Sequence, residues 1–394
     1  MSIAQVERYG AHNYHPLPVV VAHAEGAWVT DVHGRRYLDM LSAYSALNQG
    51  HRHPRILAAA RDQLDRVTLT SRAFHNEKLG PFLEKLSAVS GFSRALPMNS
   101  GAEAVETALK AMRKWGYTHR GIPADKAEII VAHDNFHGRT ISVVSFSTEP
   151  GYRAGFGPFT PGFVVVPFGD AASIEAAITP NTAAVFLEPI QGEAGILVPP
   201  DGYLRDVREI CTRRGVLMVL DEIQTGLGRT GRMWCADHEG VRPDGLTIGK
   251  ALGGGVYPVS AFCADDEVMD VFGPGTHGST FGGNPFAAAV ATAALDVIVD
   301  ERLPERAEIV GAHFRRRLRA LDAPKVREVR GKGLLIGVEL HASAGRARPY
   351  CEALMERGVL CKDTHEQVIR FAPPLVLTDE DLDWAMERIG EVLA

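Results

Sequence analysis

The middle of the chain alternates short β-branched runs with longer stretches of helical periodicity. The runs lack the polar alternate positions of a half-exposed strand, which indicates strands buried on both faces, as in a parallel sheet covered by helices. The expected strands are residues 128–132, 163–167, 183–187, 216–221, 245–249 and 259–264. Helical patterns lie between several of them, at 102–115, 173–178 and 204–214. This alternation predicts an α/β domain.

The end of the chain follows a different pattern. After helical stretches at 285–299 and 304–321 come strand-like runs at 326–330, 334–340 and 368–371, and a last helix from Asp379. This order is typical of a smaller α+β domain. The first 45 residues show no helical period and are assigned to the same outer layer. We therefore expect an N-terminal segment (1–47) that packs with the small domain, a large domain (48–290) and a C-terminal small domain (291–394).

Composition and charge exclude several classes of protein. The 394 residues carry 42 Lys and Arg against 48 Asp and Glu, a net charge of −6, without a basic block. We therefore expect neither nucleic acid nor a membrane as partner. No apolar run reaches the roughly 18 residues that a membrane span needs. The N-terminus shows no secretion or import signal, and five scattered cysteines are expected to be reduced thiols in a cytoplasmic protein.

The segment Ser100-Gly101-Ala102-Glu103 opens the helical stretch that runs to residue 115. Ser100 as N-cap and Glu103 three residues later form a capping box, which by itself explains the motif. Alternatively, the glycine lets a phosphate approach the free N–H groups and the positive end of the helix dipole. Taken alone, the motif favours the cap.

Two charged side chains stand at the ends of apolar strands. Asp221 ends the run 216–221, and the carboxyl edge of an open α/β sheet is where ligand-contacting groups lie. A cap is the simpler role, but a nearly buried Asp needs a cationic partner and no Arg or Lys adjoins it. Lys250 follows the run 245–249; most lysines are surface charges, yet desolvation at a strand end makes a nucleophilic amine. A helix-end phosphate site with these two groups suits pyridoxal phosphate, its ring nitrogen on Asp221 and its aldehyde on Lys250.

Six histidines occur in pairs of short spacing. No acidic cluster accompanies them in a recognisable order of metal ligands. Structural or polar roles are therefore favoured, and we expect no metal site. These residues are His12, His15, His51, His53, His133 and His137.

Further motifs resemble one family over almost the whole chain. LDEIQTGLGRTG (220–231) together with GKALGGGVYPVSA (249–261) resembles the class III, fold-type I pyridoxal-phosphate aminotransferases. YGAHNYHPLPVV (9–20), LTSRAF (69–74) and RFAPPL (370–375) point to the ornithine branch of that family. The resemblance implies a large domain with a mostly parallel seven-stranded sheet covered by helices, and a smaller α+β domain from both termini.

The resemblance also implies a role for each candidate cofactor-binding residue. Lys250 would bind the aldehyde and move the proton, while Asp221 would hold the ring nitrogen protonated. Gln224 would bond the ring hydroxyl and Phe136 would stack on the ring. The cofactor phosphate would be bound by Ser100, Gly101 and Ala102, and by Thr280 of the neighbouring subunit, which implies a homodimer with shared active sites.

For the substrates, the resemblance implies that Arg370 binds the α-carboxylate of glutamate or 2-oxoglutarate and Arg139 the distal carboxylate. Tyr14 and Tyr44 would shape the ornithine pocket. Glu193 would pair with Arg370 when ornithine is bound. His137 follows Phe136 where animal members of the ornithine branch carry a tryptophan, which leaves the pocket shape open.

The implied reaction is a ping-pong transfer of the δ-amino group of L-ornithine to 2-oxoglutarate, giving L-glutamate 5-semialdehyde and L-glutamate, a step between arginine metabolism and proline biosynthesis. One alternative is another class III ω-aminotransferase that uses N-acetylornithine, 4-aminobutyrate or putrescine. A second, of a different class, is a binding or regulatory protein that keeps the fold without turnover.

Overall fold

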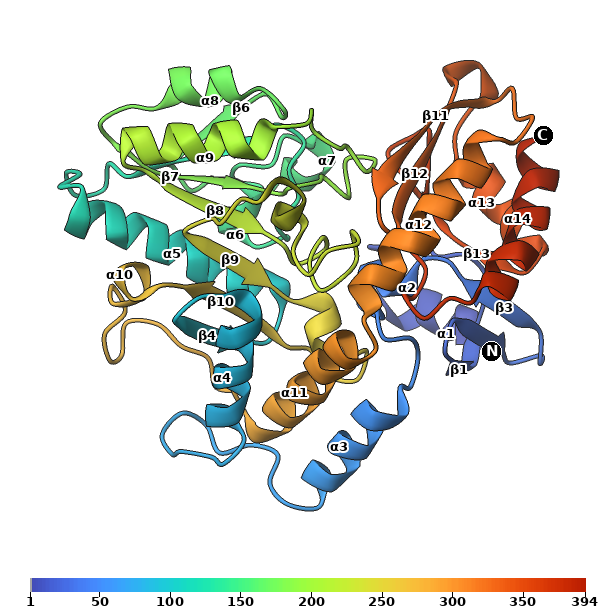
Figure 1. The fold of residues 1–394 in the computed structure, drawn as a ribbon, viewed down its shortest axis with the longest axis horizontal. Coiled ribbons are helices and arrows are strands. Elements are labelled where there is room, and N and C mark those ends of the chain that lie inside the picture. The colour runs from blue at the N-terminus through green and yellow to red at the C-terminus, as the bar shows by residue number, and fades with distance from the viewer. Residues whose placement is uncertain (1) are drawn as a thin grey trace.

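A computed structural model describes residues 2–394. Its elements form a larger group around the strands β4 to β10 and a smaller group built from both ends of the chain (Figure 1). Within residues 2–394, no helix is both long and apolar enough to span a membrane. All five cysteines are buried, and none of them forms a disulfide bond within residues 2–394.

The larger group is built on one seven-stranded sheet in the order β4-β10-β9-β8-β7-β5-β6. Strand β10 is antiparallel to both of its neighbours, and the other pairs are parallel. The expected mostly parallel seven-stranded sheet is therefore confirmed. Its strands are β4 (Arg94–Met98), β5 (Glu128–Ala132), β6 (Phe163–Val166), β7 (Thr182–Leu187), β8 (Leu217–Asp221), β9 (Gly245–Ile248) and β10 (Ser260–Ala264).

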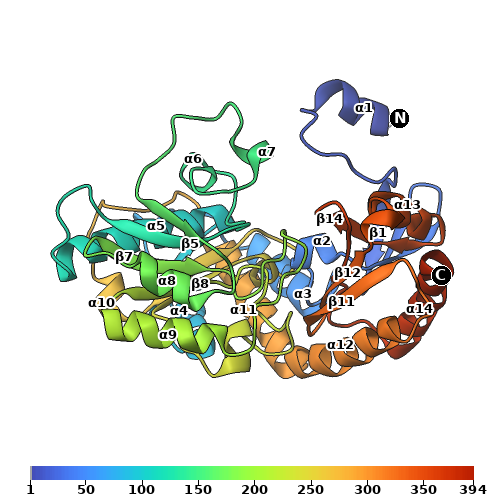
Figure 2. The same cartoon turned by 90° about the horizontal axis from the view of Figure 1, so that it is seen from above.

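Helices cover both faces of this sheet, which explains why the central strands β7, β8 and β9 are buried at every position. Successive residues of a strand point to opposite faces. In β7, Phe186 packs in the cluster of helix α5 (Gly101–His119), whereas Leu187 packs in the cluster of helix α9 (Tyr203–Arg214) on the other side (Figure 2). The remaining helical elements of this group are α3 (Pro54–Leu64), α4 (Leu79–Ser90), α6 (Ile141–Val144), α7 (Pro150–Arg153), α8 (Ala171–Ala177), η1 (Cys235–Glu239), η2 (Lys250–Gly253), α10 (Asp266–Met269) and α11 (Pro285–Asp300).

The smaller group contains two four-stranded sheets and three longer helices. One sheet has the order β1-β2-β3-β13, in which β3 pairs in parallel with β13, so the two ends of the chain share a sheet. The other has the order β11-β12-β15-β14. The strands are β1 (Val21–Glu25), β2 (Trp28–Asp31), β3 (Arg36–Asp39), β11 (Val326–Lys332), β12 (Leu335–Leu340), β13 (Val359–Leu360), β14 (Lys362–Thr364) and β15 (Val368–Phe371). The helices are α12 (Leu303–Arg319), α13 (Arg348–Glu356), α14 (Asp379–Leu393) and the short η3 (Ala342–Ala344).

The first 45 residues differ from the prediction at two places. Residues 2–9 form helix α1 (Ser2–Tyr9), which stands apart from the two groups (Figure 2). Ile3, Val6 and Tyr9 recur at helical spacing, but all three are exposed, so no buried stripe marks this helix. The second place is α2 (Ser42–Ser45), a turn whose four residues all have left-handed φ between 47° and 71°. The domain borders themselves stay a prediction.

Candidate active site

Three ionisable side chains stand at the carboxyl edge of the large sheet. Glu188 follows β7, Asp221 ends β8 and Lys250 follows β9, and parallel strands bring these ends to one edge. Burial lowers the pKa of the Lys250 amine, although the charges of Glu193 and Asp221 act against that shift. Burial, and then the charge of Asp221, raise the pKa of Glu188 well above its usual value. The edge therefore holds an amine that loses its proton readily, as a nucleophile or proton carrier must.

Asp221 is held in place by one side chain and one backbone group. His137 Nδ1 lies 2.7 Å from Asp221 Oδ2, and the Ile223 N–H donates to Oδ1 at 3.0 Å. The His137 ring stacks on Phe186 with centroids 4.2 Å apart. Sequence reasoning gave His137 only a structural or polar role and missed this contact, because the two residues are 84 positions apart. A carboxylate has about four lone-pair sites, so Asp221 keeps acceptor capacity for a further donor.

The capping box at the start of α5 is confirmed. The Glu103 N–H donates to Ser100 Oγ at 3.3 Å, and the Ser100 N–H donates to Glu103 Oε2 at 2.6 Å. The backbone at Gly101 packs closely on Ile223, because a Cβ there would lie 3.1 Å from the Ile223 side chain and would require that side chain to shift. The first turn of a helix leaves N–H groups without intrahelical partners, and Gly101 and Ala102 lie in that turn. The box uses the N–H groups of Ser100 and Glu103, so it does not occupy those of Gly101 and Ala102.

Gln224 and Phe136 each donate a hydrogen bond to a carboxylate of the candidate site. Gln224 Nε2 donates to Glu193 Oε1 at 3.2 Å, while its Oε1 is buried without a partner among residues 2–394. Gly192 permits this close approach, since a Cβ on it would lie 1.6 Å from Gln224 Oε1. The Phe136 N–H donates to Glu188 Oε2 at 2.9 Å. Glu188 escaped sequence reasoning, although it follows a buried strand just as Asp221 ends one.

Arg370 on β15 is paired with Glu193 in the loop that follows β7. Arg370 Nη1 lies 2.5 Å from Glu193 Oε1, and Nη2 lies 3.4 Å from Oε2. The Arg370 guanidinium lies over the Tyr44 ring, 5.0 Å from its centroid, and the left-handed turn α2 presents that ring. Burial raises the pKa of the Tyr44 hydroxyl, so it stays protonated. The buried Arg370 guanidinium is therefore covered by the carboxylate of Glu193, a loop residue outside the sheet β11-β12-β15-β14.

The other expected substrate residues lie farther out. Arg139 lies over two rings, 5.5 Å from the centroid of Phe136 and 4.0 Å from that of Tyr152. Tyr14 is 71% exposed; Thr280, which is expected to bind the cofactor phosphate of the neighbouring subunit, is exposed as well. Among residues 2–394, no group of three or more His, Cys, Asp or Glu side chains is arranged to hold a metal ion.

The chain is similar to known proteins over almost its whole length. Residues 9–393 match the model of the family described as Aminotransferase class-III. The chain is 61% identical over 391 residues to the ornithine aminotransferase of Brevibacillus brevis, covering 99% of this chain and 97% of that one. A crystal form of Toxoplasma gondii ornithine aminotransferase with partial occupancy of pyridoxal phosphate has a TM-score of 0.98 at 48% identity, covering 100% and 93%. An acetylornithine aminotransferase of Elizabethkingia anophelis has a TM-score of 0.90 at 47% identity, covering 100% and 98%.

Proposed function

The chain belongs to the class III aminotransferase family, and from that premise we propose that it transfers the δ-amino group of L-ornithine to 2-oxoglutarate. The products are L-glutamate 5-semialdehyde and L-glutamate. Two amines of different shape must then enter one pocket in turn. Ornithine presents a terminal amine, whereas glutamate presents an amine with a carboxylate directly beside it.

The cofactor is pyridoxal phosphate, which when bound withdraws electrons from the carbon that carries the amine. The site fits this group. Gln224 Oε1, buried without a partner in the described chain, is an acceptor for a ring hydroxyl, and Asp221 keeps lone pairs for a protonated ring nitrogen. The first turn of α5 suits the phosphate. The proposed cofactor-binding residues are Ser100, Gly101, Ala102, Phe136, Asp221, Gln224 and Lys250, with Thr280 reaching the partner's phosphate.

The chain's own groups then divide the work. Lys250, whose pKa is lowered by burial, takes a proton from the amine-bearing carbon of the donor and would pass it to the aldehyde carbon of the bound cofactor. Asp221 would hold the ring nitrogen of the bound cofactor protonated, and the contact with His137 fixes the orientation of the Asp221 carboxylate. Arg139 receives the distal carboxylate of the five-carbon acid. Tyr14 and Tyr44 bond the α-amino and carboxylate groups of ornithine.

The observation that carries the proposal is the ion pair between Glu193 and Arg370. An uncovered Arg370 would draw every substrate in by its α-carboxylate, because bidentate bonds from arginine to carboxylates are strong. With Glu193 on it, the pocket accepts an amine whose neighbouring carbon carries no carboxylate, as at the δ-carbon of ornithine. When Glu193 moves away, Arg370 is free for glutamate or 2-oxoglutarate. Arg370 Nε, buried without a partner among residues 2–394, is a further donor for that acid.

A screen of amine donors tests the proposal. The purified holoenzyme is mixed with L-ornithine, N-acetylornithine, 4-aminobutyrate or putrescine, and the loss of the cofactor's aldehyde absorbance is followed. Ornithine should react fastest, and addition of 2-oxoglutarate should restore the absorbance. A faster reaction with N-acetylornithine or a simple diamine would support the alternative ω-aminotransferases. No reaction with any donor would favour a binding protein without turnover.

We further propose a homodimer in which Thr280 completes the partner's site. Two adjoining loops expose large apolar side chains next to Thr280: Phe74 is 72% exposed and Phe281 is 46% exposed. Asn76 Nδ2 donates to the Gly283 carbonyl at 3.3 Å, which holds the loops together. An exposed apolar patch of this kind is typical of a subunit interface. Sedimentation of the holoenzyme tests the dimer, and loss of cofactor affinity in Thr280→Val tests the shared site.

We also propose a cytoplasmic location and domain borders near residues 47 and 290. Five buried cysteines without disulfide partners in the described chain suit a reducing cytoplasm. The borders near residues 47 and 290 place the large sheet in one unit. Limited proteolysis followed by mass spectrometry would locate them.

A further inference from the structure

Two arginines stand in one row of the sheet β11-β12-β15-β14. Arg330 on β11 pairs with Gly337 on β12, and Gly337 pairs with Arg370 on β15. Residues directly opposite each other on neighbouring antiparallel strands point to the same face. Arg330 and Arg370 therefore flank a glycine on one face of this sheet.

The loop that carries Glu193 lies across this row. A Cβ on Gly337 would lie 3.2 Å from the Gly195 carbonyl oxygen and 3.3 Å from the Ile196 Cβ. The absence of a side chain at Gly337 thus leaves the space that residues 195 and 196 fill. The loop sits on the sheet at the midpoint between the two arginines.

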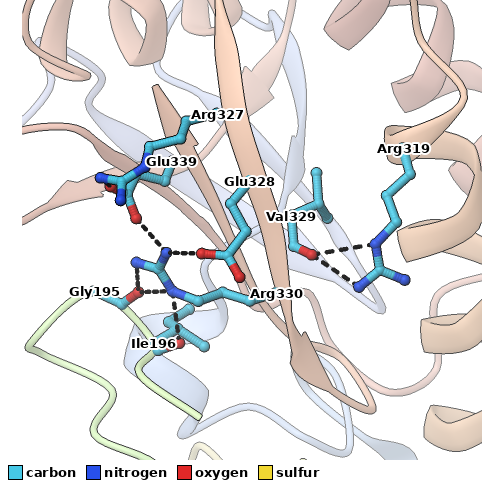
Figure 3. Close-up of polar contacts among 8 residues, drawn as sticks. All are labelled: Gly195, Ile196, Arg319, Arg327, Glu328, Val329, Arg330 and Glu339. Carbon is cyan, nitrogen blue, oxygen red and sulfur yellow. Dashed lines mark hydrogen bonds and ion pairs between the residues drawn. The ribbon is translucent and has the colours of Figure 1, made fainter. Parts of the chain in front are cut away.

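Each arginine binds a different part of the loop. Arg370 binds the Glu193 carboxylate, as described above. Arg330 binds backbone: its Nε donates to the carbonyls of Gly195 and Ile196, each at 3.0 Å, and its Nη2 donates to Gly195 at 2.7 Å (Figure 3). A substrate carboxylate can replace Glu193 on Arg370, whereas the bonds of Arg330 go to the main chain and remain.

Arg330 is itself held firmly. Its Nη1 donates to Glu328 Oε2 at 2.8 Å and also to Glu339, and its side chain is 11% exposed (Figure 3). The neighbouring Val329 carbonyl accepts two bonds from Arg319 of helix α12, at 3.2 and 2.8 Å. Both the strand and the guanidinium therefore have contacts that do not depend on the loop.

The loop conformation requires such a support. Ile196 has φ +57° and Gly195 has φ +103°. A β-branched residue in the left-handed region is strained and persists only where its surroundings enforce it. The Arg330 bonds go to the carbonyls of these two residues. Glu193 has one further backbone anchor, since Thr364 Oγ1 donates to its carbonyl at 2.7 Å.

We propose that Arg330 is a positioning residue for the Glu193 switch: it fixes residues 195 and 196 so that Glu193 alone moves and returns to Arg370 after each glutamate half-reaction. This inference rests on the proposed function, because it assumes that Glu193 alternates between covering and uncovering Arg370. Loss of Arg330 leaves Arg370 uncovered for a larger fraction of the time. The pocket then favours glutamate over ornithine.

Arg330→Gln and Arg330→Lys test the inference in the holoenzyme, with Arg327→Gln as matched control. Arg327 lies on the same strand and pairs with the same Glu339, at 2.7 Å, but its side chain is 65% exposed and has no bond to the loop. The readout is the ratio of the stopped-flow rates with glutamate and with ornithine. Both Arg330 variants should raise this ratio about three- to tenfold, the usual range for a residue that acts through another. Lysine keeps the charge but cannot form the forked bonds. Arg327→Gln should keep the parent ratio.

A binding measurement gives a second readout. Calorimetric titration with glutarate, an unreactive dicarboxylate, should show tighter binding to the Arg330 variants by a similar factor and no change for the control. A double variant with Glu193→Ala separates the causes, because residues that act through one another are not additive. Adding Arg330→Gln to Glu193→Ala should leave the ratio of that single variant unchanged.

Several results would overturn the inference. One is a parent-like ratio of glutamate to ornithine rates in both Arg330 variants, or in Arg330→Lys alone if Arg330→Gln does not fold. Another is an equal change of this ratio by Arg330→Gln with Glu193 present and with Glu193 replaced by alanine. A parent-like ratio in Glu193→Ala itself would instead refute the switch in the proposed function.

Discussion

Replacing Glu193 by alanine should change which substrate the enzyme prefers. The Glu193 carboxylate covers the Arg370 guanidinium, and both carboxylate oxygens face it. Arg370 is 1% exposed. Without the Glu193 carboxylate, the Arg370 guanidinium is open to water or to the α-carboxylate of an incoming acid. Glutamate should gain from this change, and ornithine should lose.

The magnitude follows from the pKa of Glu193. Burial is the largest single influence and would raise this pKa, but the charge and hydrogen bond of Arg370, the charge of Lys250 and the hydrogen bond from Gln224 together outweigh it, and the pKa falls from 4.5 to about 2. At 1.36 kcal/mol per unit, this shift corresponds to about 3 kcal/mol in favour of the charged carboxylate. The Glu193 side chain is 24% exposed, so water recovers part of this energy in the variant. We therefore expect the ratio of glutamate to ornithine rates to rise about 10- to 100-fold.

The same pKa fixes the sign of the pH dependence. A carboxyl group whose pKa is lowered on folding contributes stability above its unfolded value, here 4.5, and loses it as the pH falls through about 2. The Glu193 carboxylate is therefore fully charged near neutral pH. Its contribution to the parent ratio should not change between about pH 6 and pH 9.

Stopped-flow measurement of aldehyde loss, with each amine separately, gives the two rates in parent and variant. Glu193→Gln is the control for size, since it keeps the volume and a polar contact with Gln224 but removes the charge. It should shift the ratio in the same direction as alanine. A ratio that stays at the parent value in both variants, or that moves toward ornithine, would refute the reasoning.

Three further changes test the assigned groups. Lys250→Ala should abolish turnover while circular dichroism and the melting temperature stay near those of the parent, since its amine is the proton carrier; retained turnover would contradict that role. Asp221→Asn should keep the cofactor bound but slow proton transfer by at least about 100-fold in single-turnover measurements, because an amide cannot hold a ring nitrogen protonated. Parent-like rates would mean that Asp221 only caps the Ile223 N–H. Tyr14→Phe should harm the reaction with ornithine roughly tenfold more than that with 4-aminobutyrate, which lacks the α-amino acid group. Equal losses in steady-state assays would show that Tyr14 only packs.

The buried strands of the large sheet were readable from the sequence, and one strand was not. β8 and β9 are largely apolar and buried at every position, because helices cover both of their faces. β4 (Arg94–Met98) escaped notice, since it contains Pro97, starts with an exposed residue and lies at the sheet edge. An edge strand needs neither a continuous apolar run nor every N–H, so its composition resembles that of a loop.

For the site, the sequence by itself determined that Asp221 and Lys250 stand at the ends of buried strands. That information is local, because burial of a strand is recorded in its own residues and parallel strands place their ends at one edge. Only the tertiary structure decided that His137 is the partner of Asp221. The same holds for the row of Arg330, Gly337 and Arg370, which depends on the register of three strands. Register and loop conformation are set by packing between segments that are distant in the chain, and no short stretch of sequence contains both sides of such a contact.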